Sequence, residues 1–283
     1  MQQLFDLAFT RIERAKPKRA EFGEAWAEYI SRHPWEIELD ALGPCQFEIR
    51  VVVTEPAPLV LSMVFSEWLA ALRAALDNGL YAWVAAVTGQ NPPPKAESLQ
   101  YPICETAADF KHQSNRLKTL PVAILDRLEK AQPYQSPYGP KSNLFYWLNE
   151  LTRTDRHRTP HVGLGRIAEH KVRIGIPTGA TAVFDTTVRP YNFIDKDVVV
   201  GRFTTRRPFA PSQITCDLTG VGIDPEIRGW ADFDMNGTKP ALEKRMIMTE
   251  IFTRNSLENM ALFSGATPLD GFRTFDPANA EET

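Results

Sequence analysis

A basic, histidine-containing stretch occupies residues 148–161 and has the sequence LNELTRTDRHRTPH. Three arginines, one aspartate and two of the five histidines of the chain meet there: Arg153, Asp155, Arg156, His157, Arg158 and His161. A neutral imidazole can accept a proton near physiological pH, and a guanidinium group offers paired donors to phosphate oxygens. The stretch therefore indicates acid–base chemistry on a phosphate-containing substrate, a packing network between helices, or a solvated basic surface.

A second polar pair lies on a long helix that the sequence predicts after residue 58. Arg73 and Asp77 are four residues apart and share one face of that helix, beside an apolar stripe. Because burying a charge is costly unless it is paired, we expect their partners on another helix. Arg153 and His157 are also four residues apart, so we predict that the two helices pack together. The predicted cluster contains Arg73, Asp77, Asn78, Asp155, His157 and Arg158.

The elements that must position these side chains follow from the hydrophobic pattern. Helical spacing predicts helices at 3–15, 21–31, 59–87, 107–116, 120–131, 142–158 and 240–263. Runs rich in β-branched residues, bounded by Pro, Gly and Asp, predict strands at 35–40, 46–54, 171–176, 180–188, 198–204, 213–218 and 226–233. Pro17 separates the first two helices and Pro160 ends the sixth, because proline lacks the N–H that a helix interior needs.

The order of these elements predicts an α+β fold: a helical N-terminal core with a small β-hairpin, then an antiparallel β-rich region and a C-terminal helix. We expect a mostly helical domain at 1–165, with the hairpin near 35–54, and a β-rich region with its closing helix at 166–265. The acidic tail at 266–283 is expected to be disordered. We expect the C-terminal helix to pack on the sheet, and the alternative is that it returns to the helical half.

Composition narrows the class of protein. A hydrophobic share of 43%, a charged share of 24% and a net charge of −3 are typical of a soluble globular protein without a global basic field for nucleic acid. Cys45, Cys104 and Cys216 form no CxxC pair, which argues for reduced thiols. The N-terminus lacks a signal-peptide pattern, and charged residues interrupt the longest apolar run, 68–87. We therefore expect a cytoplasmic protein.

Four phrases of the sequence resemble those of an uncharacterised group of bacterial proteins. They are LRAALDN at Leu72–Asn78, YPI at Tyr101–Ile103, QPY at Gln132–Tyr134, and a helix that ends in DRHR at Arg158. Their order is the same as in the group, over about residues 66–161. Asn78 and Arg156 stand where the group tends to have histidine and lysine. The resemblance implies a helical core and no particular activity.

Arg156 and His161, with four residues between them, resemble the motif of HEPN-type helical domains. The resemblance implies a metal-independent ribonuclease, usually a dimer, in which the histidine acts in acid–base catalysis and the arginine holds the phosphate. Pro160 interrupts what is a helical motif in that family. His157 and His161 also have the i,i+4 spacing of zinc ligands on a helix, although the glutamate of HExxH is absent.

The sequence therefore predicts a cytosolic binding or interaction protein. Its Arg–Asp–His network would be an internal scaffold, and its β half the surface for a ligand or partner. The alternative is a HEPN-like metal-independent ribonuclease of a defence or toxin system, acting as a homodimer. In that case His161 or His157 is the acid–base group, and Arg156 or Arg153 clamps the phosphate. The expected partner is an unknown protein or RNA, with no membrane, metal or cofactor.

Overall fold

The computed structural model describes residues 2–157, 162–165, 172–185, 193–218, 224–230, 233 and 240–265. It confirms the α+β class, with a long N-terminal helix, a hairpin, antiparallel sheets and a closing helix. Contacts divide the chain into two compact units. The helical unit comprises 1–21, 64–159 and 233–283, and the β unit comprises 22–63 and 160–232.

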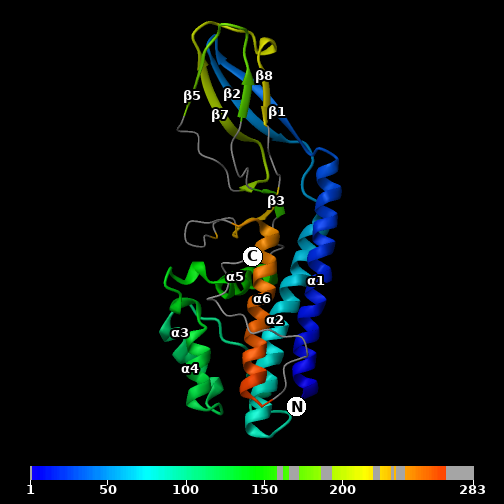
Figure 1. Cartoon of the computed structure of the whole chain (residues 1–283), viewed down its shortest axis with the longest axis vertical. Helices are drawn as coiled ribbons and strands as arrows, with labels where there is room; N and C mark the ends of the chain where they lie inside the picture. Colours follow the sequence, from blue (N-terminus) through cyan, green and yellow to red (C-terminus); the bar gives the residue numbers. More distant parts are fainter. Residues whose placement is uncertain are drawn as a thin grey trace, which may run out of the picture. The chain divides into compact units, whose positions relative to one another are not determined.

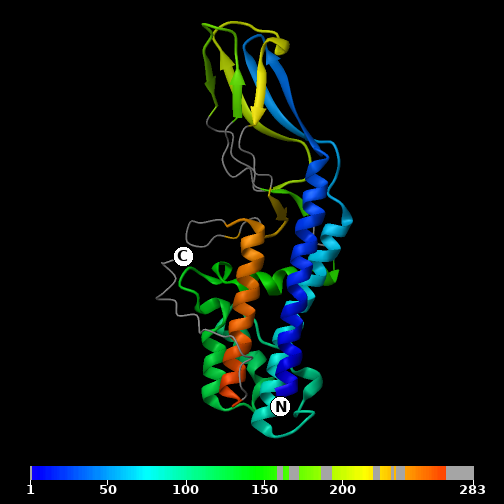
Figure 2. The same cartoon turned by 45° about the vertical axis from the view of Figure 1, so that its right-hand side comes forward.

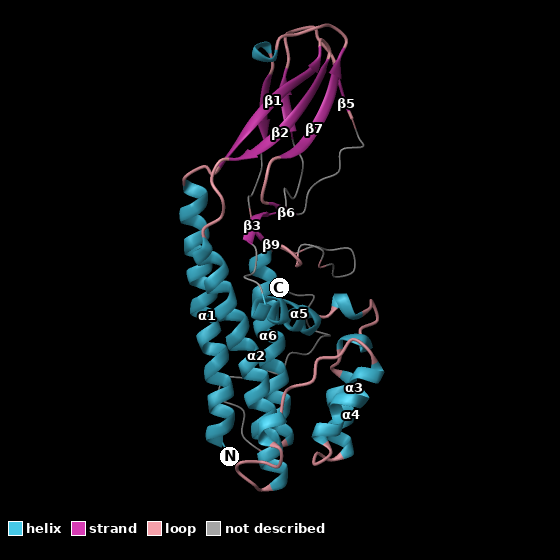
Figure 3. Ribbon diagram, turned by 180° about the vertical axis from the view of Figure 1, so that it is seen from behind, coloured by secondary structure: helices cyan, strands magenta, loops and turns pink. Residues whose placement is uncertain are grey.

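Six α-helices are described: α1 (Gln2–Ser31), α2 (Leu59–Thr88), α3 (Ala107–Ser114), α4 (Val122–Lys130), α5 (Leu144–His157) and α6 (Leu242–Phe263). Short 3₁₀ turns lie at Ala96–Ser98, Asn115–Leu117, Pro133–Gln135, Pro140–Ser142 and Pro211–Gln213. In the helical unit α1, α2 and α6 run side by side, and they keep this arrangement in the turned view (Figures 1 and 2). The shorter α5 lies across them (Figure 3).

Close packing of α2 against α6 forms the centre of the helical unit. Trp68, Leu72 and Leu80 of α2 are completely buried, as their helical spacing predicts. Gly79 allows α6 to approach, because a Cβ at that position would overlap the side chain of Leu257. The helix α2 has the length and apolar composition of a membrane span, but 56% of its most apolar window is buried inside the protein. Core packing therefore accounts for its apolar character.

Aromatic contacts fix α6 in the helical unit. Phe145 of α5 packs against Phe252 of α6 with ring centroids 4.7 Å apart, and its other neighbour is Tyr101, at 5.7 Å. The indole N–H of Trp68 donates to Glu250 of α6 at 2.9 Å. The expectation that the C-terminal helix packs on the sheet is therefore wrong, and the alternative in the helical half is the one that the structure has.

The β unit contains three antiparallel sheets. One has the strand order β1-β2-β7-β5, with β1 at Trp35–Gly43, β2 at Gln46–Val53, β7 at Val198–Thr205 and β5 at Ala182–Phe184. The second has the order β6-β3-β9, at Phe193–Ile194, Val162–Gly165 and Pro225–Ile227, and the third pairs β4 (Val172–Gly175) with β8 (Thr215–Leu218). Phe47 and Phe203 face each other across β2 and β7 and stack at 5.1 Å, which fixes the register of that pair.

The structure corrects several predicted boundaries. Pro17 does not separate two helices, since α1 continues through it. Burial of Phe9 and Ile12 before the proline and of Phe22 and Trp26 after it outweighs the hydrogen bond that proline removes.

Strand boundaries differ as well. The strand predicted at 226–233 ends at Ile227, and the sequence analysis did not anticipate β3 or β6. The compact units also cut across the boundary at residue 165, because β2 pairs with β7 and α6 joins the helices. Whether 1–165 and 166–265 fold as separate domains stays a prediction, and the tail at 266–283 lies outside the described residues.

Candidate functional site

The predicted pair Arg73 and Asp77 holds a backbone segment in place. Arg73 is only 6% exposed, and its Nη2 donates to the carbonyl oxygen of Tyr101 at 2.8 Å and lies 3.2 Å from Oδ1 of Asp77. The same Oδ1 accepts the N–H of Tyr101 at 2.8 Å. The pair therefore satisfies both backbone polar groups of one residue in an extended segment. The sequence did not anticipate this backbone partner, and the expectation that the pair also meets polar groups of another helix stays a prediction.

A glutamine completes this arrangement on the next residues of the segment. The side chain of Gln132 is 1% exposed, and its Oε1 accepts the N–H of Cys104 at 2.9 Å. Its Nε2 donates to the carbonyl oxygens of Pro102 and Leu128 at 3.1 and 2.8 Å. Three of the four sequence motifs, those that contain Arg73, Tyr101 and Gln132, thus meet around residues 101–104. Their side chains hold the backbone of this segment in place there.

The stretch 148–161 is described only in part. Asp155 accepts a hydrogen bond from the hydroxyl of Ser66, so α5 and α2 pair as predicted, about two turns away from Arg73. Arg153 is exposed and lies 2.6 Å from Glu150. Asn78 is half-buried on α2 and shows no side-chain hydrogen bond to another described residue.

The groups on which acid–base chemistry would depend are not among the described side chains. Arg156 and His157 belong to α5, but their side chains are not described. Arg158 and His161 lie outside the described residues altogether. The catalytic roles assigned to these residues therefore stay predictions.

Two predicted site residues do come together at a small cavity of about 160 Å³, which we call the polar pocket. Arg73 reaches it from α2 and Arg153 from α5. Polar side chains form much of its remaining lining: Gln100, Gln113, Asn149 and Thr152. Asp77 and Asp155 are not among the residues that line it.

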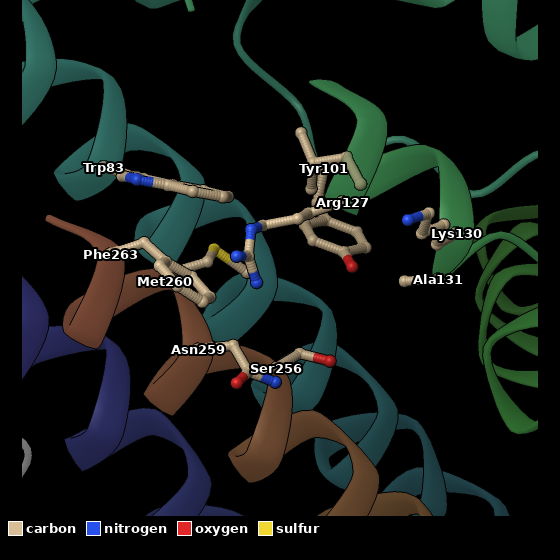
Figure 4. Close-up of a pocket in the computed structure, with 10 residues that line it drawn as sticks. Trp83, Tyr101, Arg127, Lys130, Ala131, Ser256, Asn259, Met260 and Phe263 are labelled. Atoms are coloured by element: carbon tan, nitrogen blue, oxygen red, sulfur yellow. The ribbon is translucent and has the colours of Figure 1, made fainter. Parts of the chain in front are cut away.

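A larger cavity of about 340 Å³ was not anticipated from the sequence (Figure 4). We call it the amphipathic pocket. Its walls come from α2, α4, α6 and the extended segment at 101: Trp83, Tyr101, Arg127, Leu128, Lys130, Ala131, Ser256, Asn259, Met260 and Phe263. Apolar and aromatic groups dominate the list, and two cations and two neutral polar side chains accompany them. Such a composition is typical of small-molecule sites.

Among the described residues, Arg127 and Lys130 give the amphipathic pocket a positive charge, and none of its described lining residues is acidic. The Cζ atom of Arg127 lies 3.6 Å from the ring centroid of Phe263, a cation–π contact that holds the guanidinium among aromatic groups (Figure 4). Burial raises the pKa of Tyr101 to about 12, although a hydrogen bond with Ser256 opposes this. The phenol therefore stays neutral at physiological pH.

One signal in the sequence could have indicated this pocket. Ser256, Asn259 and Phe263 recur at the spacing of a single helix face, as do Arg127 and Lys130 on α4. Neither pattern tells which faces meet, because that depends on contacts between segments more than 100 residues apart.

The β half, where the sequence placed the ligand or partner surface, has a pocket of about 370 Å³ beside β5. Val183 and Phe184 expose apolar surface there. Arg202 also lines it, but Asp185 brings a carboxylate into the same lining, and the Nη2 atom of Arg202 lies 2.7 Å from Glu48. This pocket therefore has a weaker electrostatic preference for a ligand than the amphipathic pocket.

Burial makes two of the cysteines poor nucleophiles. Cys104 is buried, and that burial raises the pKa of its thiol to about 11, so it is protonated at neutral pH. Burial also raises the pKa of Cys216. In the part of the chain that the structure describes, no three His, Cys, Asp or Glu side chains gather as metal ligands.

Comparisons with family models, with curated proteins and with solved structures find no match to this chain. The resemblances to the bacterial group and to HEPN-type domains therefore stay predictions from the sequence.

Proposed function

We propose that this chain is a binding protein for a small organic anion with a flat apolar body, which the amphipathic pocket would hold. The observation that carries this proposal is an aromatic cavity whose described lining has two cations and no carboxylate, in a chain whose net charge is −3. Neither Arg127 nor Lys130 has an ion-pair partner among the described residues. A ligand carboxylate, sulfonate or phosphate would supply that partner.

The apolar walls would bind the body of the ligand. Trp83 and Met260 line the cavity and are each 2% exposed, and Arg127 lies over the ring of Phe263. Each Å² of apolar surface removed from water contributes roughly 25 cal/mol to the free energy of binding. A flat ring system that contacts several apolar walls at once would bury the most such surface. A volume of about 340 Å³ lies within the range of small-molecule sites, at its lower end.

Scaffold contacts keep the pocket in shape. Tyr101 forms one wall, and Arg73 and Asp77 fix its backbone at 2.8 Å on both sides. On this proposal the Arg73–Asp77 pair acts as an internal scaffold, as the sequence suggested, while the ligand contacts come from α4 and α6.

The experiment is a fluorescence titration with a matched pair of probes. 8-Anilinonaphthalene-1-sulfonate carries a flat ring system and one anionic group, and N-phenyl-1-naphthylamine has the same rings without the sulfonate. We expect saturable 1:1 binding of the sulfonate probe to the wild type. Arg127→Met should weaken its binding at least tenfold and leave binding of the neutral probe within about twofold, because only the charge contact is lost.

The control variant is Arg116→Met, which removes an exposed arginine that does not line the pocket. It should bind both probes as the wild type does. Equal affinity of the sulfonate probe for wild type and Arg127→Met, or equal loss in both variants, would refute the proposal.

A cytoplasmic location belongs to the same proposal, supported by the apolar α2 being a core helix and by free thiols at all three cysteines. For the ribonuclease alternative, the side chains of Arg156, His157 and His161 are not described, so no observation favours it over the binding protein.

A further inference from the structure

We infer that the polar pocket is a second binding site, for a small inorganic oxyanion such as phosphate or sulfate. Four parts of the chain converge on it: α2, the segment near residue 100, α3 and α5. This inference does not depend on the amphipathic pocket, because the two cavities share only Tyr101 among their lining residues.

Two guanidinium groups supply the positive charge of the polar pocket. Arg73 is held rigidly, because it is only 6% exposed and its contacts with Tyr101 and Asp77 fix the orientation of its guanidinium group. Arg153 has 69% of its side chain exposed and is held by Glu150 at 2.6 Å. The planar fork of arginine fits tetrahedral oxyanions, and a pre-oriented fork loses little entropy when it binds one.

The counter-charges lie outside the cavity. Asp77 and Glu150 pair with the two arginines, but neither carboxylate lines the pocket. An incoming oxyanion would therefore meet the two cations without a facing carboxylate. The oxyanion would compete with Glu150 for Arg153. Its affinity for the site should therefore depend on the charge of residue 150.

Neutral donors complete the site. Gln100, Gln113 and Asn149 each have an amide N–H₂ that can replace water around an oxyanion. The hydroxyl of Thr152 already donates to the carbonyl oxygen of Leu148 at 2.6 Å, so it adds no donor. A volume of about 160 Å³ holds several water molecules at about 30 Å³ each, enough for one tetrahedral ion and too little for the flat ligand of the larger pocket.

The test is isothermal titration of the full-length protein with inorganic phosphate, at constant ionic strength, with sodium chloride as the comparison salt. We expect saturable binding of phosphate to the wild type and none of chloride. Arg153→Gln should weaken phosphate at least tenfold, and the matched variant Arg206→Gln, an exposed arginine of the β unit, should change it less than twofold. Since Arg153 is mostly exposed, its replacement should leave the fold intact.

A second variant gives a result that a merely structural role would not produce. Glu150→Gln releases Arg153 from its carboxylate, so it should bind phosphate more tightly than the wild type does. Absence of phosphate binding, equal loss in the two arginine variants, or weaker binding by Glu150→Gln would each overturn the inference. Binding of the sulfonate probe should be the same in Arg153→Gln as in wild type, so failure of this inference and failure of the proposed function are distinguishable.

Discussion

The environment of Glu258 on α6 strongly disturbs the ionisation of its carboxyl group. Its side chain is only 13% exposed, and its Oε1 has no hydrogen-bond partner among the described groups. The nearest cation, Arg254, lies 3.9 Å away and also pairs with Glu13 of α1. Burial raises the pKa of this carboxyl from 4.5 to about 7, and the attraction of Arg254 only partly opposes the shift.

This raised pKa predicts a dependence of stability on pH. In the unfolded chain Glu258 releases its proton near pH 4.5, whereas in the folded chain it keeps it until about pH 7. The folded state therefore binds more protons in that window, and stability falls as pH rises from 4.5 to 7. Glu258→Gln, which stays neutral, should be more stable than wild type at pH 8 by about 1–3 kcal/mol, and no more stable at pH 4.

Urea unfolding of both proteins across that pH range measures the difference in their free energies of unfolding. The other titrating groups contribute equally to both proteins, so their contribution cancels in this difference. Glu24→Gln, at an exposed position of α1, is the control and should follow the wild-type profile. A constant difference between Glu258→Gln and wild type at every pH would contradict the raised pKa.

The sequence predicted partial burial for the pair Arg73 and Asp77, and their side chains are 8% and 28% exposed. One of their partners, the backbone of Tyr101, could not be predicted from residue types, because a backbone group has no side-chain signal. The cations of the amphipathic pocket escaped notice for a related reason. Arg127 and Lys130 look like ordinary surface charges until α6 is placed beside them.

Among the elements, the extended segment at residues 101–104 has no strand partner, and side chains take the place of a neighbouring strand. Gln132 alone serves the N–H of Cys104 and the carbonyl oxygen of Pro102. Ring contact of Tyr101 with Phe145 adds apolar packing to these bonds. The segment therefore depends on a few specific side chains more than on secondary structure.

Gln132→Ala should lower the free energy of unfolding by about 2–4 kcal/mol, because it leaves a buried donor and buried acceptors without partners, at about 1–3 kcal/mol each. Gln90→Ala, at an exposed position just after α2, should change stability by less than about 0.5 kcal/mol. Urea denaturation followed by circular dichroism compares the two. A loss below about 1 kcal/mol for Gln132→Ala would show that water or rearrangement replaces its bonds.

The helices and strands that the sequence predicted best are those with a clear local signal, such as a capping residue or a glycine at a helix end. The helix α3 begins where expected, because the hydroxyl of Thr106 accepts the N–H of Asp109 as an N-cap. The helix α2 ends before Gly89, whose φ of +67° suits glycine. By contrast β3 and β6 have too few residues to show an alternating pattern, and only pairing with distant segments makes them strands.

For the whole molecule, the decisive contacts join segments far apart in the sequence. β2 pairs with β7, and α6 packs on α2 at Gly79. Local periodicity does not reveal such pairings, so the sequence analysis grouped the hairpin with the helices and favoured the sheet as the place of α6. Both α1 and α2 contribute residues to each compact unit.

These connections predict that the segment 1–165 will not fold by itself. Without α6 it loses the buried side chains of Leu242, Met246, Leu257 and Met260, which fill the helical unit. Without β7 it leaves β2 as an unpaired edge, a pattern prone to aggregation. We expect a fragment 1–165 to show no cooperative urea transition and to aggregate, whereas a chain ending at residue 265, which keeps every described residue, should unfold as the full-length protein does.

A cooperative transition of the shorter fragment would mean that the first helices and the hairpin form a true domain. The contacts of α6 would then be an addition to a core that is already complete. Since Trp68 reaches Glu250 and Gly79 receives Leu257, we expect instead that the helical core closes only when the last helix has been added.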